Sequence, residues 1–160
     1  MTVRDNVIYA NTGGRFFDPD PAQTTSDYAL YYNQVYTAMA SGNALFYLYK
    51  AIPTILFRDN KIWDTRTTDV ESFKCDFTAH DVEGNTVYNP NNANLVVIDN
   101  SSGSDVGKTF AQYVAGVDST AVNTSPGWTD PANGDFSVPS GSGQSSYRGA
   151  MVSRILLGAM

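Results

Sequence analysis

The chain has 160 residues, a length typical of one domain with a buried core. Hydrophobic residues make up 42% of it and charged residues 16%, which excludes a highly charged disordered tail. Ten Lys and Arg stand against sixteen Asp and Glu, and the resulting charge of −6 argues against broad binding to nucleic acid or to anionic lipid. We therefore expect neither a specific nucleic acid nor a membrane as a partner.

The N-terminal residues lack the basic stretch and the apolar run of about 7 to 15 residues that mark a secretory signal. The longest apolar run, Ala44–Tyr49, is far shorter than the roughly 20 residues that cross a bilayer. A soluble protein without signal peptide or transmembrane segment is predicted. The single cysteine, Cys75, cannot form an intramolecular disulfide, so packing must hold the fold together.

Residues 1–25, which contain Gly13-Gly14 and the prolines Pro19 and Pro21, are predicted to form an extended N-terminal arm. A helix is predicted over 27–41, because aromatic and apolar side chains recur there at helical spacing between Ser26 and Gly42: Tyr28, Tyr31, Tyr32, Val35 and Met39. A second helix, or a strand, is predicted within 106–117; we favour the helix.

Between these two segments the chain is predicted to form short strands. Residues 54–57 and 61–63 flank a turn-like tripeptide and predict a hairpin. Further strands are expected at 72–80, where apolar and polar side chains alternate, and at 86–88 and 95–98. The prediction is a mainly β fold with one or two helices (α+β), in which domain 26–117 has a β-sandwich or barrel-like core and carries extended terminal arms.

The stretch 118–146 is unusually long and polar for a connection. Of its 29 residues, 22 are Gly, Pro, Ser, Thr, Asn or Asp, and it also carries the apolar side chains Trp128, Phe136 and Val138. Because pure linkers seldom carry large apolar anchors, we interpret 118–146 as an interaction loop that lies on another surface. The C-terminal residues 147–160 are predicted to form a strand or arm, in which Ile155, Leu156 and Leu157 bind a partner.

Two motifs that could carry chemistry are weak. Residues 102–109 imitate a phosphate-binding loop, but Gly103 lies one residue too late and Asp105 would repel an anion, so a surface loop is favoured. His80 is the only histidine and alternation points it away from Cys75, which disfavours a catalytic pair. No catalytic residue or cofactor is therefore predicted, and the chain is expected not to be an enzyme.

One metal candidate remains in the polar stretch. Asp130, Asn133 and Asp135 could hold a weak Ca²⁺ site, although the 12-residue calcium loop with its terminal Glu is missing and a Pro/Asp/Gly turn explains the same residues.

Aromatic residues leave a binding function open. Trp63, Trp128 and the ten tyrosines could stack on sugar rings, or they could fill a core or a protein interface. A carbohydrate-binding or receptor-binding module that uses exposed Trp and Tyr is therefore one hypothesis.

Strands and turns rich in Ser, Thr, Asn and Gly, many more Asp than Glu, one cysteine and long irregular arms together resemble the structural proteins of tailed-bacteriophage virions. The resemblance lies in composition and layout over the whole chain, without a diagnostic motif. It implies a non-enzymatic subunit of the virion, assembled in the host cytoplasm, whose partners are copies of itself and other virion proteins. A capsid-associated decoration or cement protein, or a small coat component, is favoured. A tail-tube or other tail component is the alternative.

Overall fold

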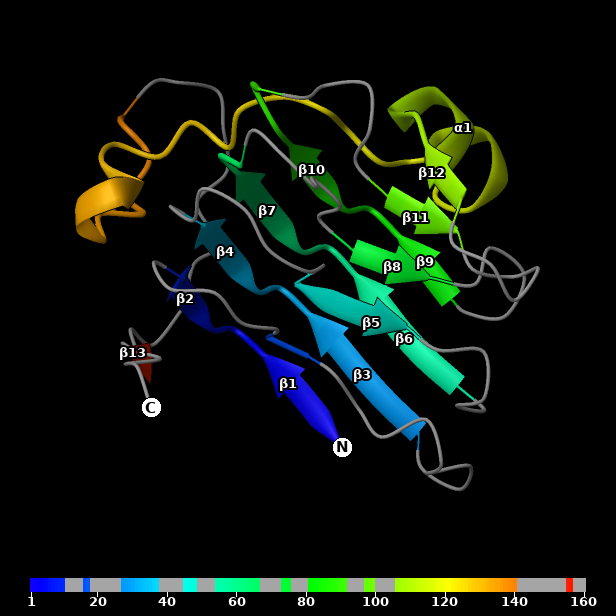
Figure 1. The fold of residues 1–160 in the computed structure, drawn as a ribbon. Helices are drawn as coiled ribbons and strands as arrows, with labels where there is room; N and C mark the ends of the chain where they lie inside the picture. Colours follow the sequence, from blue (N-terminus) through cyan, green and yellow to red (C-terminus); the bar gives the residue numbers. More distant parts are fainter. Residues whose placement is uncertain are drawn as a thin grey trace.

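The computed structural model describes the chain in ten segments: residues 1–10, 16–17, 27–37, 45–48, 54–66, 73–75, 81–91, 97–99, 106–140 and 155–156. Their strands form three sheets (Figure 1). Sheet A is parallel throughout and has the order β1 (Thr2–Arg4), β3 (Asp27–Tyr31), β6 (Thr54–Arg58) and β9 (Asp81–Glu83).

Sheets B and C continue the same pattern. Sheet B is also parallel, in the order β10 (Thr86–Tyr88), β7 (Lys61–Asp64), β4 (Gln34–Thr37), β2 (Val7–Ala10) and β13 (Ile155–Leu156). Sheet C pairs β5 (Phe46–Leu48), β8 (Phe73–Cys75) and β11 (Val97–Asp99) in parallel, and β12 (Val106–Lys108) runs antiparallel to β11. Phe17 adds a parallel bridge to Phe46 at the other edge of sheet C.

The chain visits the three sheets in turn and then repeats the circuit. A strand of sheet A is followed by one of sheet B and then one of sheet C, and each strand pairs with the equivalent strand of the next circuit. Equivalent positions lie 27, 27 and 25 residues apart along the sequence. The described strands thus form a parallel β-helix, a coil in which each turn contacts its neighbours.

Two apolar positions in every circuit point into the coil. One is in sheet A and the other in sheet B: Val3, Leu30, Phe57 and Val82, then Ile8, Val35, Ile62 and Val87. All but Val3 and Val82 are 0% exposed, and these two also belong to or pack against the same cluster. Fully burying each such side chain contributes about 1.5–3 kcal/mol, so this repeated pair forms the centre of the core.

A tight corner joins sheet A to sheet B in every circuit. The corner residue has a left-handed backbone, with φ between 54° and 71°: Asp5, Tyr32, Asp59 and Gly84. A Cβ at Gly84 would lie only 2.5 Å from a carboxylate oxygen of Asp59, so the fourth corner favours glycine for its φ and for its space.

The residue after each corner is an asparagine, and these four form what we call the asparagine ladder: Asn6, Asn33, Asn60 and Asn85. The last three are 0% exposed. The side-chain Oδ1 of each of these three accepts two hydrogen bonds, from the backbone N–H and the Nδ2 of the asparagine below, at 2.9–3.3 Å. Because this pattern satisfies buried amides in every layer, the ladder fixes the stacking of successive corners.

Asp118 ends the ladder. Its Oδ2 accepts hydrogen bonds from the backbone N–H and the Nδ2 of Asn85, each at 3.0 Å, and from the hydroxyl of Tyr113 at 3.1 Å. A carboxylate only accepts, so it receives the last donors of the ladder and needs no acceptor in a further layer. Burial alone would raise the pKa of Asp118, but the hydrogen bonds from Asn85, Thr120 and Gly84 outweigh it and lower the pKa.

Helix α1 (Phe110–Gly116) lies at the same end of the coil (Figure 1). Thr109 and Gln112 form a capping box at its start, because each accepts a hydrogen bond from the backbone N–H of the other. Tyr113 is 0% exposed, and Phe110 and Val117 pack against the core. The helix therefore covers apolar surface at this end of the coil that would otherwise be exposed to water.

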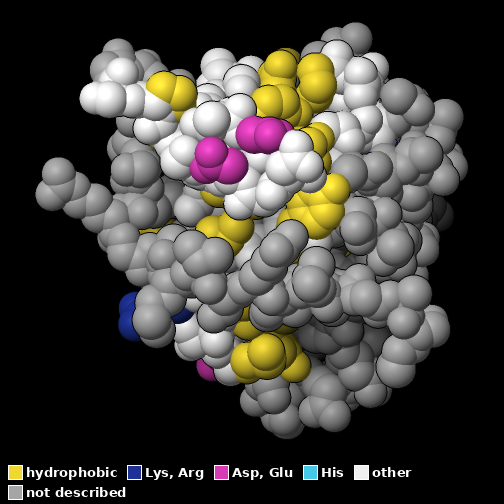
Figure 2. Space-filling model, turned by 90° about the vertical axis from the view of Figure 1, so that its left-hand side faces the viewer, with side chains coloured by type: hydrophobic (Ala, Val, Ile, Leu, Met, Phe, Trp, Pro, Cys, Tyr) yellow, Lys and Arg dark blue, Asp and Glu magenta, His cyan; other side chains and the backbone are white. Residues whose placement is uncertain are grey.

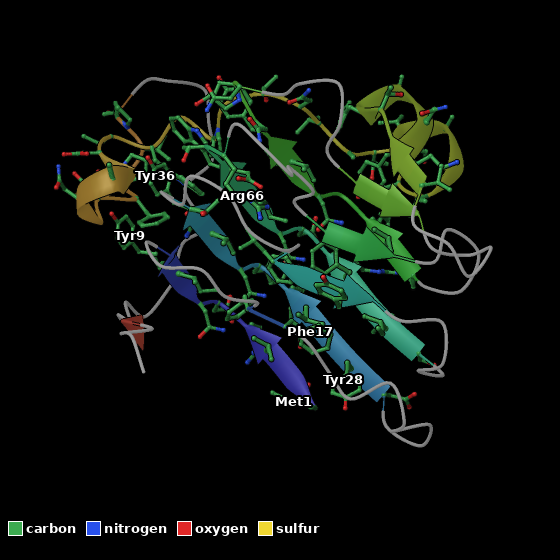
Figure 3. The ribbon with its side chains drawn as sticks, in the orientation of Figure 1. Met1, Tyr9, Phe17, Tyr28, Tyr36 and Arg66 are labelled. Atoms are coloured by element: carbon green, nitrogen blue, oxygen red, sulfur yellow. The ribbon has the colours of Figure 1, made fainter. Side chains whose placement is uncertain are left out.

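A buried ion pair lies on the C-terminal side of β7. The side chains of Asp64 and Arg66 are both 0% exposed, and Arg66 Nε donates to Asp64 Oδ1 at 2.8 Å. Figure 3 marks Arg66 near the C-terminal end of β7. Because neither side chain contacts solvent, removal of either residue would leave the charge of the other buried and uncompensated.

The predicted mainly β class is confirmed, with one short α-helix in the described part. Its strands do not form the expected β-sandwich or barrel-like core, because they pair in parallel from circuit to circuit as a β-helix. The expected strands are found at all five places: Thr54–Arg58, Lys61–Asp64 and Thr86–Tyr88 cover the predicted ranges, and Phe73–Cys75 and Val97–Asp99 overlap theirs. The second helix is also confirmed, although β12 occupies its first residues. No helix in the described segments is long and apolar enough to span a membrane.

The helix predicted over 27–41 is wrong, because β3 and β4 occupy its described part. Tyr28 packs on Phe17 and Val35 is in the core, so both point inward from different strands. The corner at Tyr32 interrupts the strand alternation and leaves these two positions seven residues apart, which imitates two helical turns. The hairpin at 54–63 is also wrong, since β6 and β7 belong to different sheets.

The predicted division of the chain also changes. Residues 2–10 are strands of the first circuit rather than an arm, because β1 and β2 pair with β3 and β4. Residues 118–122 belong to the coil, since Asp118 ends the ladder and Val122 forms a parallel bridge with Thr86.

Candidate binding face on sheet B

An aromatic side chain stands at the same position of every circuit on the outside of sheet B. These four residues follow the ladder asparagines by three positions and are aligned in register: Tyr9, Tyr36, Trp63 and Tyr88. Tyr9 and Tyr36 are stacked with their centroids 5.9 Å apart, and Trp63 meets Tyr36 and Tyr88 edge to face at 5.7 and 5.4 Å. Figure 3 shows Tyr9 and Tyr36 on neighbouring strands β2 and β4.

The chain after the coil crosses this row of rings. Trp128 stacks on Trp63 with a centroid distance of 6.1 Å and an interplanar angle of 25°, and Phe136 lies 4.6 Å from Trp128. Trp128 is only 5% exposed. We call these six residues the aromatic face: Tyr9, Tyr36, Trp63, Tyr88, Trp128 and Phe136.

Residues 129–137 form a compact hook beside the aromatic face. Thr129 N–H donates to the Ser137 carbonyl at 2.8 Å, and the backbones of Asp130 and Asp135 exchange hydrogen bonds at 3.0 and 2.9 Å. The 3₁₀ turn η1 (Pro131–Asn133) lies inside, and Gly134 closes it with φ 85°. The hook therefore holds its shape through its own hydrogen bonds.

The hook carries two carboxylates. Asp130 Oδ2 accepts from Asn133 Nδ2 at 2.8 Å, and Asp135 Oδ1 accepts from the Ser137 N–H at 2.9 Å. The hydrogen bonds from Ser137 lower the pKa of Asp135. In the described segments neither carboxylate forms an ion pair with a Lys or Arg. Figure 2, which views the side of the molecule that carries the hook, shows acidic side chains among hydrophobic ones.

The hydroxyl of Tyr36 is influenced by a ring of the aromatic face and by a carboxylate of the hook. Burial raises the pKa of its hydroxyl first of all, and the neighbouring Tyr9 and Asp130 raise the pKa further. The face is therefore one in which aromatic carbon, tyrosine hydroxyls and carboxylates lie close together.

The two indole N–H groups are the unusual feature of the face. Trp63 Nε1 and Trp128 Nε1 are both buried and have no hydrogen-bond partner among the residues that the structure describes. Leaving a buried donor unpaired costs about 1–3 kcal/mol, and most buried polar groups in native proteins avoid it. The packing of Trp128 on Trp63 thus carries a penalty that the ring contacts must offset.

The structure corrects the prediction for Trp128 and qualifies that for its neighbours. Trp128 is buried against its own chain, so it offers no ring to a partner in this conformation. Phe136 and Val138 are half-buried. Ile155 and Leu156 lie in β13 beside β2, and Leu157 lies outside the described residues.

The other sequence candidates form no site in the described residues. Asp130, Asn133 and Asp135 come together in the hook, but no set of three metal-ligating side chains of the His, Cys, Asp and Glu types is found there. Cys75 lies in β8, and His80 lies outside the described residues. Thr109, the last residue of the imitated phosphate loop, caps α1, whereas 102–105 lie outside.

Sequence reasoning missed the repeat that builds this face. The pattern Asn, any residue, Ile or Val, then Tyr or Trp occurs four times, at 6–9, 33–36, 60–63 and 85–88. A search for self-similarity at a period of 25 to 27 residues would have found it and indicated stacked circuits. Comparisons with models of protein families, with curated proteins and with solved structures find no match to this chain.

Proposed function

We propose that this protein is a non-enzymatic structural subunit of a viral particle of the tailed-bacteriophage kind. The observation that carries the proposal is the coil itself, in which a buried asparagine ladder and an aligned hydrophobic core repeat from layer to layer. A solenoid of this kind is a stiff element whose layers contact only their neighbours. The composition, rich in Ser, Thr, Asn and Gly and with many more Asp than Glu, supports the viral assignment.

A coil favours a projecting position over a flat one. Its layers add length along one axis and leave the outer faces of the sheets available to neighbours. We therefore favour a tail component over a decoration or cement protein of the capsid. Partners in either position are copies of this chain and other virion proteins.

The edge of sheet B formed by β2 and β13 is our candidate for subunit contact. β13 has two residues and pairs only with β2 in the described segments. Short terminal strands can pair with the sheet edge of a neighbouring subunit, because backbone hydrogen bonds do not depend on which chain supplies them. We expect residues 155–157 to take part in assembly in this way.

Light scattering after size-exclusion chromatography tests the proposal. We expect the purified chain to form a defined oligomer and Ile155→Asp to be monomeric with an unchanged unfolding transition. Val122→Asp is the matched control. Val122 is 46% exposed and lies at the opposite, capped end of the coil, so the Val122→Asp variant should still form the wild-type oligomer. A wild-type chain that is monomeric at all concentrations would contradict the assembly role.

A further inference from the structure

The strongest unexplained feature of the molecule is the pair of buried indole donors on the aromatic face. Trp63 and Trp128 lie with their rings stacked, and neither Nε1 has an acceptor. Trp128 is more than nine-tenths buried. Since native proteins rarely leave such donors unpaired, a second arrangement in which they meet acceptors would be favoured.

The segment that covers Trp63 can move without breaking backbone hydrogen bonds to the coil. The last such bonds in the described residues are those of Val122, which donates to Asn85 and accepts from Val87. From there to residue 140 the backbone hydrogen bonds among the described residues lie within the hook, and rings of the segment stack on sheet B. Movement of 125–138 therefore breaks none of these backbone bonds, but it separates the ring contacts and uncovers the buried Pro126 and Pro131.

The groups gathered here define the chemistry of a suitable ligand. The indoles offer flat apolar faces and two N–H donors, whereas Asp130 and Asp135 offer carboxylate oxygens that can accept further hydrogen bonds. A sugar ring matches all three, because its C–H face stacks on aromatic carbon and its hydroxyls both donate and accept.

Other ligand classes match less well. A Lys or Arg side chain would satisfy the carboxylates but would leave the indole donors unpaired. A phosphate-bearing ligand would be repelled by the same carboxylates and by the net charge of −6.

We propose that Trp63, Trp128 and the hook carboxylates Asp130 and Asp135 form a binding site for a neutral oligosaccharide, which is reached when residues 125–138 move off sheet B. In the observed arrangement the two indole rings stack on each other. A bound sugar ring would take the place of this ring–ring contact. This inference does not rest on the virion role, since either can hold without the other.

A glycan array carries the first test, with neutral oligosaccharides beside sialylated and sulfated ones. We expect the folded wild-type chain to bind at least one neutral oligosaccharide. Binding should also change the intrinsic fluorescence, because the only two tryptophans of the chain are those of the site. Absence of neutral binding, or binding of charged glycans alone, overturns the proposal.

Variants then assign the binding to this site. Trp128→Ala and Asp135→Ala should each weaken the Kd for that oligosaccharide at least tenfold. Glu83→Ala is the matched control, because Glu83 is an exposed acid on sheet A, and its Kd should stay within twofold of wild type. If Trp128→Ala fails to fold, the exposed residue Asp135 decides: an unchanged Kd in Asp135→Ala overturns the site.

Discussion

Asn60→Ala is the most direct test of how the coil is held together. All four hydrogen-bonding positions of the Asn60 amide are used: Oδ1 accepts twice from Asn33, and Nδ2 donates to the Leu30 carbonyl and to Asn85 Oδ1. Asn60 is 0% exposed, so water cannot replace what alanine lacks. The substitution removes all four hydrogen bonds in the middle of the ladder.

The expected loss follows from the groups left behind. The backbone N–H of Asn33 and one hydrogen of its Nδ2 lose their partner, and the Leu30 carbonyl loses one donor, whereas Asn85 Oδ1 still accepts from the backbone N–H of residue 60. At about 1–3 kcal/mol for each unpaired buried group, and allowing for relaxation, Asn60→Ala should lower the free energy of unfolding by about 3–6 kcal/mol. In a chain of this size that corresponds to a Tm lower by about 10–20 °C.

Asn6→Ala is the matched control at the end of the ladder. Asn6 is partly exposed and its Nδ2 makes two hydrogen bonds, to the Arg4 carbonyl and to Asn33 Oδ1, each at 2.9 Å. Asn33 Oδ1 keeps the backbone donor of residue 6, so the loss should be about 1 kcal/mol. Urea unfolding, monitored by circular dichroism, measures both. A difference below about 1 kcal/mol between the two variants would refute the idea that the ladder stabilises the coil.

Three further predictions concern the corner, the end of the ladder and the ion pair. Gly84→Ala should cost more than Gly134→Ala in urea unfolding, because both have φ above 70° but only the first Cβ meets an atom within 4 Å; equal losses would show that backbone strain alone matters. The folded pKa of Asp118 is lowered, so its contribution to stability is present above the unfolded value of about 3.9 and is lost as pH falls through the folded pKa. Asp118→Asn should therefore be less stable than wild type at pH 7 and should flatten the stability curve below about pH 4, whereas parallel curves would contradict this. Arg66→Met should lower the free energy of unfolding by about 3–5 kcal/mol, and adding Asp64→Leu should restore part of it; a double variant as unstable as the sum of both single ones would argue against a coupled buried pair.

The four repeats show how close the sequence comes to the fold. The motif at 60–63 places the apolar Ile62 and the aromatic Trp63 directly after a turn, and this is sufficient to predict a short strand. Alternation, however, says nothing about which strand lies next to it. From the local sequence, a hairpin with 54–57 is the simplest pairing. Only the stacking of equivalent circuits shows that Lys61–Asp64 pairs with strands 27 and 25 residues away.

By itself, the sequence determined the mainly β class and predicted the short strands at 86–88 and 95–98 and a helix within 106–117, because these depend on propensity and apolar periodicity within a few residues. Tertiary structure alone decided what the polar and aromatic repeats do. An asparagine beside a turn is ordinary until another lies directly above it, and Trp128 looked like an anchor for a partner until it stacked on Trp63. Both outcomes depend on contacts between residues far apart in sequence, where local propensity carries no information and the requirement to pair buried amides and to cover apolar rings decides.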